Sequence, residues 1–208
     1  MSYRVLIAED QAMPRMVFEN IVGTSENYTL TASVGTAKIA DVWCASGKVD
    51  LVLMDVVMED GYSGLDAAER IKRSYPGIKV IIVTSMPDQL FLERARAIGV
   101  DSFWYKEVQE RPLLELMDRT MAGEHIYPDR PPEAFIGDAT NYQLTDREID
   151  VLRALAEGLT DKEIADRLFL SVTTVRYHVN NLITKTGLPT RTSLAVNAVR
   201  SGIAIPGV

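Results

Sequence analysis

The sequence predicts two domains of different class, an α/β domain built on a five-stranded parallel sheet and, after it, an all-α domain of four helices. Three observations support this. Short apolar runs alternate with helical patterns over residues 1–122, a stretch rich in proline and glycine covers residues 123–142, and helical spacing returns over residues 143–208. A chain of 208 residues is long enough for two ordinary domains.

The strands of the first domain are predicted from short, largely apolar runs, at residues 5–8, 29–34, 51–54, 80–83 and 102–105. Helices are predicted between and after these runs, at residues 14–22, 36–46, 65–75, 87–98 and 112–121. Apolar strands separated by helices are typical of a parallel sheet that is covered on both faces. Such sheets gather their functional residues at the carboxyl ends of the strands.

The segment 123–142 is predicted to be a linker. It contains Pro128, Pro131, Pro132 and Gly137, and it shows no helical period. A structureless connection of this length is uncommon inside one domain, so the segment favours a division into two domains.

Helix-start and helix-end signals divide the last domain into short helices. Thr145, followed three residues later by Glu148, forms a capping box that opens a helix, and Gly158 is placed to end it. A second capping box, Thr160 with Glu163, opens the next helix.

A tight break separates this second helix from the third. Phe169 and Leu170 form the predicted turn, and Ser171 is placed to cap the third helix. The buried stripe of the third helix is predicted from apolar residues at helical spacing, Val175, Val179 and Leu182. Helices joined in this way set the third helix to enter the DNA major groove.

The outward face of the third helix indicates DNA as the partner. Its side chains are polar and contain no acid, and they belong to Thr173, Thr174, Arg176, Tyr177, Asn180 and Thr184. Arginine and asparagine pair bidentately with guanine and adenine edges, and hydroxyls suit phosphate oxygens. A face selected only for solubility would instead be rich in Glu and Lys, and no acid occurs anywhere between Ser171 and Val208.

These motifs resemble the LuxR/FixJ type of helix-turn-helix domain over residues 143–202. The resemblance implies that Arg176, Tyr177 and Asn180 face the groove of double-stranded promoter DNA. It also implies contacts with backbone phosphates, at Lys162, Thr173, Thr174 and Lys185.

Composition narrows the remaining possibilities. The chain is 47% apolar and 25% charged, with no run of eighteen apolar residues and no signal peptide, so we expect a cytoplasmic protein with no membrane partner. A single cysteine, Cys44, argues against a disulfide framework, and one cysteine with two histidines argues against a zinc site.

Charge is distributed unevenly along the chain. Residues 143–208 carry 8 Lys or Arg and 7 Asp or Glu, a net charge of +1, which leaves −8 for residues 1–142 out of a total of −7. Because the predicted DNA-binding domain is nearly neutral, we expect a single copy to have modest affinity for DNA. Pairing two such domains would strengthen the binding.

Polar and charged residues stand at the carboxyl ends of four predicted strands, at Glu9, Asp10, Asp55, Thr84 and Lys106. Parallel strands bring these ends to one edge of the sheet, where three carboxylates would repel unless they share a cation. Oxygen ligands of this kind suit Mg²⁺, and an aspartate can act as the nucleophile that forms an aspartyl phosphate. Acids at strand ends also commonly cap the helices that follow, which is the alternative for each of them taken singly.

This arrangement resembles the receiver domain of two-component response regulators, with its flavodoxin-like, doubly wound fold, over residues 3–122. The resemblance implies that Asp55 is the phosphoacceptor, that Lys106 pairs with the phosphoryl group, and that Thr84 is a switch residue that moves to hydrogen-bond it. It implies Mg²⁺ as the cofactor, bound directly by Asp10 and mainly through water by Glu9, with Asp55 and the carbonyl of Val57 as further ligands. Phe103 stands at the position of an aromatic switch residue, although packing in the core is the other role open to it.

Two features depart from the receiver pattern. Glu59 stands where the family usually has proline, and Gly64 comes one residue later than usual, with an extra glycine at Gly61. Lys106 is followed by Glu107, where proline or aspartate is common. We expect a longer and more acidic loop after Asp55, with consequences for the rates of phosphoryl gain and loss.

The sequence therefore predicts a DNA-binding response regulator, and not a classical enzyme. A sensor histidine kinase would supply the phosphoryl group, and phosphorylation of Asp55 would shift the chain toward a homodimer that binds paired half-sites and regulates transcription. The receiver would catalyse only its own phosphorylation and dephosphorylation.

Two alternatives stay open at this point. One is a regulator whose receiver dimerises without phosphorylation, which the altered loop motivates and the complete set of strand-end residues opposes. The other is a Mg²⁺-dependent phosphohydrolase with an aspartyl nucleophile. Such enzymes commonly need a second acid two residues after the nucleophile, where this chain has Val57.

Overall fold

The computed structural model describes residues 2–58, 63–106 and 110–204. The chain divides into two compact units. Unit 1 comprises Met1–Ser85 and Gln89–Arg130, and unit 2 comprises Met86–Asp88 and Pro131–Val208. Each unit has a hydrophobic core of its own.

Unit 1 is built on one five-stranded sheet, made of β1 (Tyr3–Ala8), β2 (Tyr28–Val34), β3 (Leu51–Asp55), β4 (Lys79–Thr84) and β5 (Ser102–Tyr105). The strand order is β2-β1-β3-β4-β5, and every neighbouring pair is parallel. The central strand β3 is buried along its whole length, as its continuous apolar sequence requires. The predicted parallel sheet is thus confirmed, with strand ends shifted by two residues or fewer.

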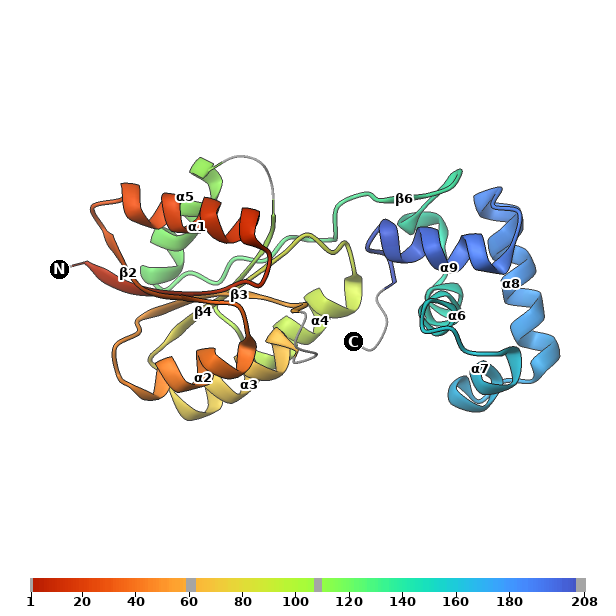
Figure 1. Ribbon diagram of the computed structural model, residues 1–208, viewed down its shortest axis with the longest axis horizontal. Coiled ribbons are helices and arrows are strands. Elements are labelled where there is room, and N and C mark those ends of the chain that lie inside the picture. Colours follow the sequence, from red (N-terminus) through yellow and green to blue (C-terminus); the bar gives the residue numbers. More distant parts are fainter. Residues whose placement is uncertain (1, 59–62, 107–109, 205–208) are drawn as a thin grey trace. The chain divides into compact units, whose positions relative to one another are not determined.

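Helices cover both faces of this sheet (Figure 1). Their bounds are α1 (Ala12–Thr24), α2 (Ala37–Ala45), α3 (Gly64–Ser74), α4 (Gln89–Ile98) and α5 (Glu110–Met121). Figure 1 shows α1 and α5 on one face and α2, α3 and α4 on the other. A core under α1 and α5 packs Phe18, Ile21 and Met117 against strand residues such as Ile7 and Leu53.

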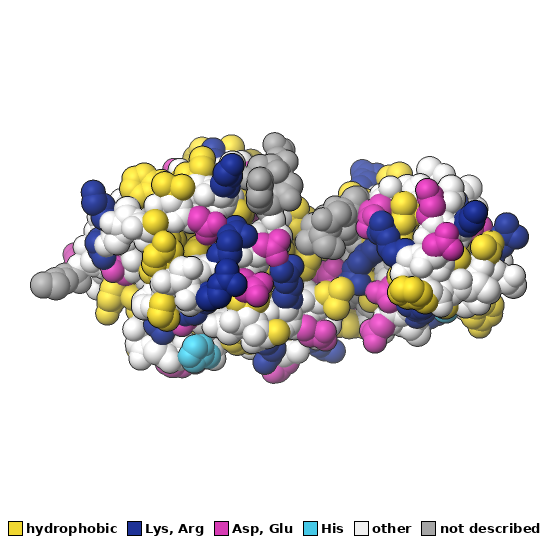
Figure 2. Space-filling view, turned by 90° about the horizontal axis from the view of Figure 1, so that it is seen from below, with side chains coloured by type: hydrophobic (Ala, Val, Ile, Leu, Met, Phe, Trp, Pro, Cys, Tyr) yellow, Lys and Arg dark blue, Asp and Glu magenta, His cyan; other side chains and the backbone are white. Residues whose placement is uncertain are grey.

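The opposite face of unit 1 carries exposed ion pairs between its helices. Figure 2 views the molecule from this side and shows basic and acidic side chains lying next to one another. Arg70 on α3 bonds Asp41 on α2 at 2.8 Å, and Arg94 on α4 bonds Asp66 on α3. Because these side chains are between a third and a half exposed, each pair contributes little to stability.

A buried ion cluster ties the start of β4 to the residue before β5. The carboxylate of Asp101 accepts hydrogen bonds from the ammonium groups of Lys72 at 2.7 Å and Lys79 at 2.9 Å. It also accepts one from the backbone N–H of Val80 at 2.9 Å. Burial by itself raises the pKa of Asp101, but these hydrogen bonds outweigh it and hold the pKa below its ordinary value.

The segment proposed as a linker, 123–142, packs on the two units in turn. In its first part, the carbonyl of Ile126 accepts from the N–H of Phe103 at 2.8 Å, and the Tyr127 hydroxyl donates to the carbonyl of Val100. This part therefore lies along the edge strand β5. In its second part, β6 (Phe135–Ile136) and β7 (Ala139–Thr140) form a hairpin that buries Ile136 and Ala139 in the core of unit 2.

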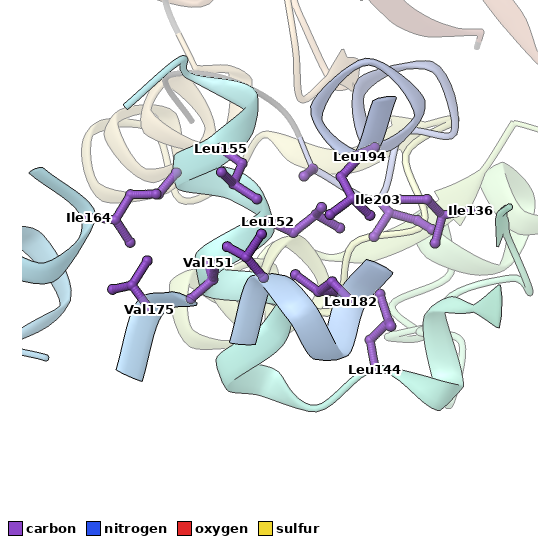
Figure 3. Packing of buried hydrophobic residues seen from close by; sticks show 14 of the residues in the cluster. Ile136, Leu144, Val151, Leu152, Leu155, Ile164, Val175, Leu182, Leu194 and Ile203 are labelled. Carbon is purple, nitrogen blue, oxygen red and sulfur yellow. The ribbon is translucent and has the colours of Figure 1, made fainter. Parts of the chain in front are cut away.

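Unit 2 is helical, with α6 (Asp146–Ala156), α7 (Asp161–Leu168), α8 (Val172–Thr186) and α9 (Arg191–Arg200), preceded by a short 3₁₀ turn (Asn141–Gln143). Its core gathers side chains from every one of these helices. Figure 3 shows Leu152 and Val151 of α6, Leu182 of α8 and Leu194 of α9 packed together. The predicted all-α domain is confirmed, with the small β6–β7 hairpin added.

Local sequence signals set the helix ends of unit 2 as predicted. Thr145 and Thr160 form capping boxes with Glu148 and Glu163, and the Ser171 hydroxyl accepts from the N–H of Thr174. The turn after α7 has an unexpected feature. Phe169 adopts a left-handed conformation, with φ of 54°, and its ring is almost fully exposed.

Among the residues that the structure describes, no helix combines the length and the apolar character needed to cross a membrane.

The Asp101 cluster predicts an acid-sensitive contribution to stability. Asp101→Asn leaves two ammonium groups without their counter-ion, and it should lower the free energy of unfolding at neutral pH by about 2–4 kcal/mol. The folded-state pKa of Asp101 is depressed, so its stabilisation is complete above the ordinary pKa of 3.8 and is lost as the pH falls through the folded-state pKa. The gap between wild type and variant should therefore close in acid.

Urea unfolding at a series of pH values measures this gap through tryptophan fluorescence, because both Trp43 and Trp104 lie in unit 1. Asp50→Asn is the control, since the side chains of the Arg4–Asp50 pair are 43% and 31% exposed and the pair should be worth less than about 1 kcal/mol. Equal losses in the two variants, or a gap for Asp101→Asn that persists in acid, would contradict the role given to the buried cluster.

Candidate functional site

Three carboxylates meet at the carboxyl edge of the sheet. Glu9 and Asp10 follow β1, and Asp55 ends β3. Strands β1 and β3 are adjacent and in register, with Ala8 opposite Met54, so the residues that follow fall side by side. One ligand oxygen from each of the three carboxylates lies within 4.8 Å of the others.

A lysine that directly follows β5 enters the same cluster. The ammonium of Lys106 donates to Asp55 Oδ2 at 2.9 Å and lies 2.6 Å from Glu9 Oε2. Its side chain is only 11% exposed, so this ion pair is largely shielded from water. The backbone places it, because the Lys106 N–H donates to the carbonyl of Thr84 at the end of β4. With all four groups ionised, the cluster carries a net charge of −2.

Burial sets the acidity of the central carboxylate. It raises the pKa of Asp55 to about 6, while the Lys106 ammonium opposes this rise and the Glu9 carboxylate adds to it. The Lys106 ammonium and the Val56 N–H both donate to Asp55, and these contacts favour its carboxylate form. A buried carboxylate in this state is available as a nucleophile.

Backbone N–H groups also donate hydrogen bonds to two of the three carboxylates. The N–H of Val56 donates to Asp55 Oδ1 at 2.8 Å, and the N–H of Gln11 donates to Glu9 Oε1 at 3.2 Å. Gly64 opens α3 directly against β3, and a Cβ at this position would lie 1.7 Å from the carbonyl oxygen of Asp55. Only glycine fits here without a backbone shift. The sequence shows a glycine after the third strand, but it does not show this close approach to the Asp55 carbonyl.

The structure also places the other residues expected at this edge. Thr84 is fully buried at the end of β4. Phe103 is buried in β5, and its ring meets that of Tyr105 edge to face with centroids 5.0 Å apart. Val57 follows the acid cluster in the chain, but its carbonyl as a metal ligand stays a prediction. Glu59, Gly61 and Glu107, which carry the departures from the receiver pattern, lie outside the described residues.

The donor set fits a hard divalent cation. Three carboxylates face one ammonium, and a cation held by oxygen ligands would compensate the excess negative charge. Glu9, Asp10 and Asp55 are the residues that could hold it.

The second site is the exposed face of α8 in unit 2. Val175, Val179 and Leu182 are buried as predicted. The expected reading side chains of Arg176, Tyr177 and Asn180 are all exposed, with Tyr177 at 62%. Thr173 on α8 and Lys162 on α7 are exposed as well, and Thr174 is half-buried beside the capping Ser171.

Lys185, expected at a phosphate, is held by protein groups in this structure. Its ammonium donates to Glu148 Oε2 at 2.7 Å and to the carbonyl of Gln143 at 3.0 Å. Burial raises the pKa of Glu148, but the bonds from Lys185 and Thr145 outweigh it, so the pKa is lowered overall. A phosphate at Lys185 would therefore compete with a satisfied ion pair, and the predicted contact stays a prediction.

The fold and the two sites define a two-part regulator, in which an α/β unit with a buried acid cluster accompanies a helix-turn-helix unit. Comparison with known families agrees. The response regulator receiver domain family matches residues 5–118, and the luxR family of bacterial regulatory proteins matches residues 142–198. The chain belongs to the response regulators, with a receiver domain and a LuxR-type DNA-binding domain.

Whole-length relatives share this organisation. The response regulator protein VraR of Staphylococcus aureus is 29% identical over 211 residues, which cover 98% of this chain and 99% of that protein. The VraR protein of Staphylococcus epidermidis is 29% identical with the same coverage.

A solved structure confirms the fold. The RcsB response regulator in complex with DNA is 17% identical, with a TM-score of 0.61, over 96% of this chain and 98% of that chain. At this identity the likeness shows the fold alone.

The close approach of Gly64 predicts a strong effect of one methyl group. Gly64→Ala places its Cβ against the Asp55 carbonyl, so the backbone that carries the acid cluster must shift. We expect a loss of about 2–4 kcal/mol in the free energy of unfolding of unit 1, measured by urea denaturation. Gly23→Ala is the control, because nothing lies within 4 Å of a Cβ there and alanine favours the helix α1. Similar stabilities for the two variants would refute the packing argument.

Proposed function

We propose that this chain is a phosphorylation-controlled transcription regulator, in which a phosphoryl group accepted by Asp55 favours a dimer whose two α8 helices read promoter DNA. The observation that supports this is the cluster of Glu9, Asp10, Asp55 and Lys106 at the carboxyl edge of the receiver sheet. The cluster combines a buried nucleophilic carboxylate with a cation partner for the group that it would receive.

The proposed transfer uses the histidine phosphate of a partner sensor kinase. A carboxylate oxygen of Asp55 attacks the phosphorus, an O–P bond forms, and the P–N bond to the kinase imidazole breaks. Lys106, which already pairs with Asp55, would then pair with the phosphoryl oxygens. Hydrolysis of the aspartyl phosphate at the same site would reset the receiver, so its catalysis is confined to its own phosphorylation state.

A divalent cation fits this step. Mg²⁺, held by Glu9, Asp10, Asp55 and the Val57 carbonyl, would stabilise the charge of the phosphoryl group during transfer. As the resemblance to receivers implies, Glu9 would act mainly through a metal-bound water; its carboxylate is fully buried and lies 2.6 Å from the Lys106 ammonium.

The proposed readout runs through β4 and β5. The Thr84 hydroxyl would move to bond the phosphoryl group, and Phe103 would repack in the space next to it. Since Phe103 sits in β5 and Lys106 follows that strand, such a change would alter the surface formed by α4 and β5. The phosphoryl group thereby shifts a population between two states of the receiver.

The DNA step is supported by the exposed face of α8 and by the relatives. RcsB, a solved response regulator with the same fold, has been captured on DNA, including as two dimers bound to two parallel DNAs. The reading unit of this chain has a net charge of only +1, so one copy would bind DNA weakly. Once one unit 2 of a dimer is bound to DNA, the effective concentration of the other unit 2 is raised. Dimerisation would therefore be an efficient way to control DNA binding.

The phosphoacceptor role of Asp55 is tested with beryllofluoride, a mimic of the phosphoryl group. In Mg²⁺ and beryllofluoride, the mass from light scattering should rise from monomer to dimer in wild type and stay unchanged in Asp55→Asn. Asp41→Asn, which removes a half-buried carboxylate on α2 that pairs with Arg70, should respond as wild type does. A mass that is unchanged in wild type would favour a phosphorylation-independent regulator, and a full response from Asp55→Asn would refute its assignment.

The reading role of Arg176 predicts a sequence-dependent loss. Arg176→Ala should cost about 1–3 kcal/mol of specific binding and relax the preference at one base position, measured by fluorescence anisotropy on a selected duplex and its single-base variants. Arg200→Ala, at the end of α9, is the control for loss of one positive charge. If Arg176→Ala weakened binding to every sequence equally, Arg176 would be a phosphate contact instead.

A further inference from the structure

One carboxylate in unit 2 bridges two arginines from different helices. Asp161, the first residue of α7, accepts from Arg176 Nε on α8 at 3.1 Å through Oδ2. Its other oxygen accepts from Arg191 Nη1 on α9 at 2.7 Å, and Arg191 also donates to the carbonyl of Leu159 at 2.7 Å. Arg191 on α9 therefore holds the Asp161 carboxylate in place, and Asp161 in turn contacts the exposed side chain of Arg176.

The bond between Asp161 and Arg176 selects which donors of the guanidinium remain available. Nε is engaged by Asp161, whereas both Nη groups of Arg176 are without a hydrogen bond to any part of the chain that the structure describes. Bidentate pairing with guanine takes two neighbouring N–H donors of the guanidinium. With Nε held, the pair that remains is the terminal Nη1/Nη2 edge.

The same bond restricts a side chain that would otherwise be mobile. The Arg176 side chain is 69% exposed, so packing alone does not fix it. An arginine loses rotamer entropy on binding unless it is held in place beforehand. Asp161 is only 22% exposed and is already anchored by Arg191, so it provides a fixed point.

We propose that Asp161 is a positioning residue for DNA reading, which holds Arg176 by its Nε so that the terminal edge of the guanidinium pairs with a guanine. This inference rests on the proposed function, and in particular on Arg176 entering the major groove. The acid is tolerated next to DNA because the trio of Asp161, Arg176 and Arg191 keeps a net charge of +1.

The test begins with selection by the full-length wild-type chain, in Mg²⁺ and beryllofluoride, from a pool of random-sequence duplex DNA. Affinities are then measured for the selected duplex and for versions in which each guanine is replaced. Asp161→Asn should lose discrimination by about tenfold at one guanine, the same position at which Arg176→Ala loses it, and keep the other preferences.

Glu157→Gln is the matched control. It also removes one negative charge and one ion pair with an arginine of unit 2, Arg167 at 2.6 Å, but it does not touch Arg176. It should leave discrimination at every guanine unchanged. Both substitutions should raise affinity for unrelated duplexes to a similar extent, because both remove one charge that repels DNA.

A double-mutant cycle separates positioning from a structural effect transmitted through Arg191. Lysine has no Nε–H to be held in this way, so Asp161→Asn should have no further effect on discrimination in an Arg176→Lys background. Thermal unfolding accompanies each variant, and a merely structural role would lower stability without singling out one guanine.

The outcomes distinguish this inference from the proposed function. If wild type selects no sequence at all, the proposed function fails and the inference fails with it. If wild type selects a site whose guanine preferences all survive Asp161→Asn, the inference alone is overturned. The inference is also overturned if Asp161→Asn remains effective in the Arg176→Lys background.

Discussion

The unequal pairing of three carboxylates with one ammonium is the constraint on which the receiver site depends. Parallel strands in register bring Glu9, Asp10 and Asp55 together, and Lys106 compensates only part of their charge. Burial makes the excess negative charge costly, and the same burial raises the pKa of Asp55. A bound cation, or a phosphoryl group that changes the local charge, would stabilise this cluster. The cluster is therefore better suited to a switch than to stabilising the fold.

Ion pairs serve different purposes in other parts of the chain, according to their exposure. In the receiver, the buried carboxylate of Asp101 is paired with two lysines, so its effect is on stability. The contact of Asp161 with Arg176 is exposed on the arginine side, where water screens the attraction and little stability is gained. What such a contact still supplies is orientation, which is the property that a base-reading arginine needs.

Much of the fold follows from local signals in the sequence. The strands can be predicted from short, largely apolar runs, and the helix starts of unit 2 from capping boxes such as Thr160 with Glu163, because both signals are local. The acid cluster was predicted because a parallel sheet brings the ends of its strands to one edge. Three features depend on contacts between distant residues and could not be predicted. These are the engagement of Lys185 by Glu148, the packing of Ile126 on β5 and the bridging role of Asp161.

The most direct test of the charge argument is the dependence of receiver stability on Mg²⁺. Urea unfolding is followed through the two tryptophans of unit 1 at increasing Mg²⁺ concentration, for wild type and for Asp10→Asn. The account predicts that wild type gains stability with the logarithm of the Mg²⁺ concentration and that Asp10→Asn gains much less. A wild-type stability that does not change with Mg²⁺ would contradict it, because Lys106 alone would then satisfy the cluster.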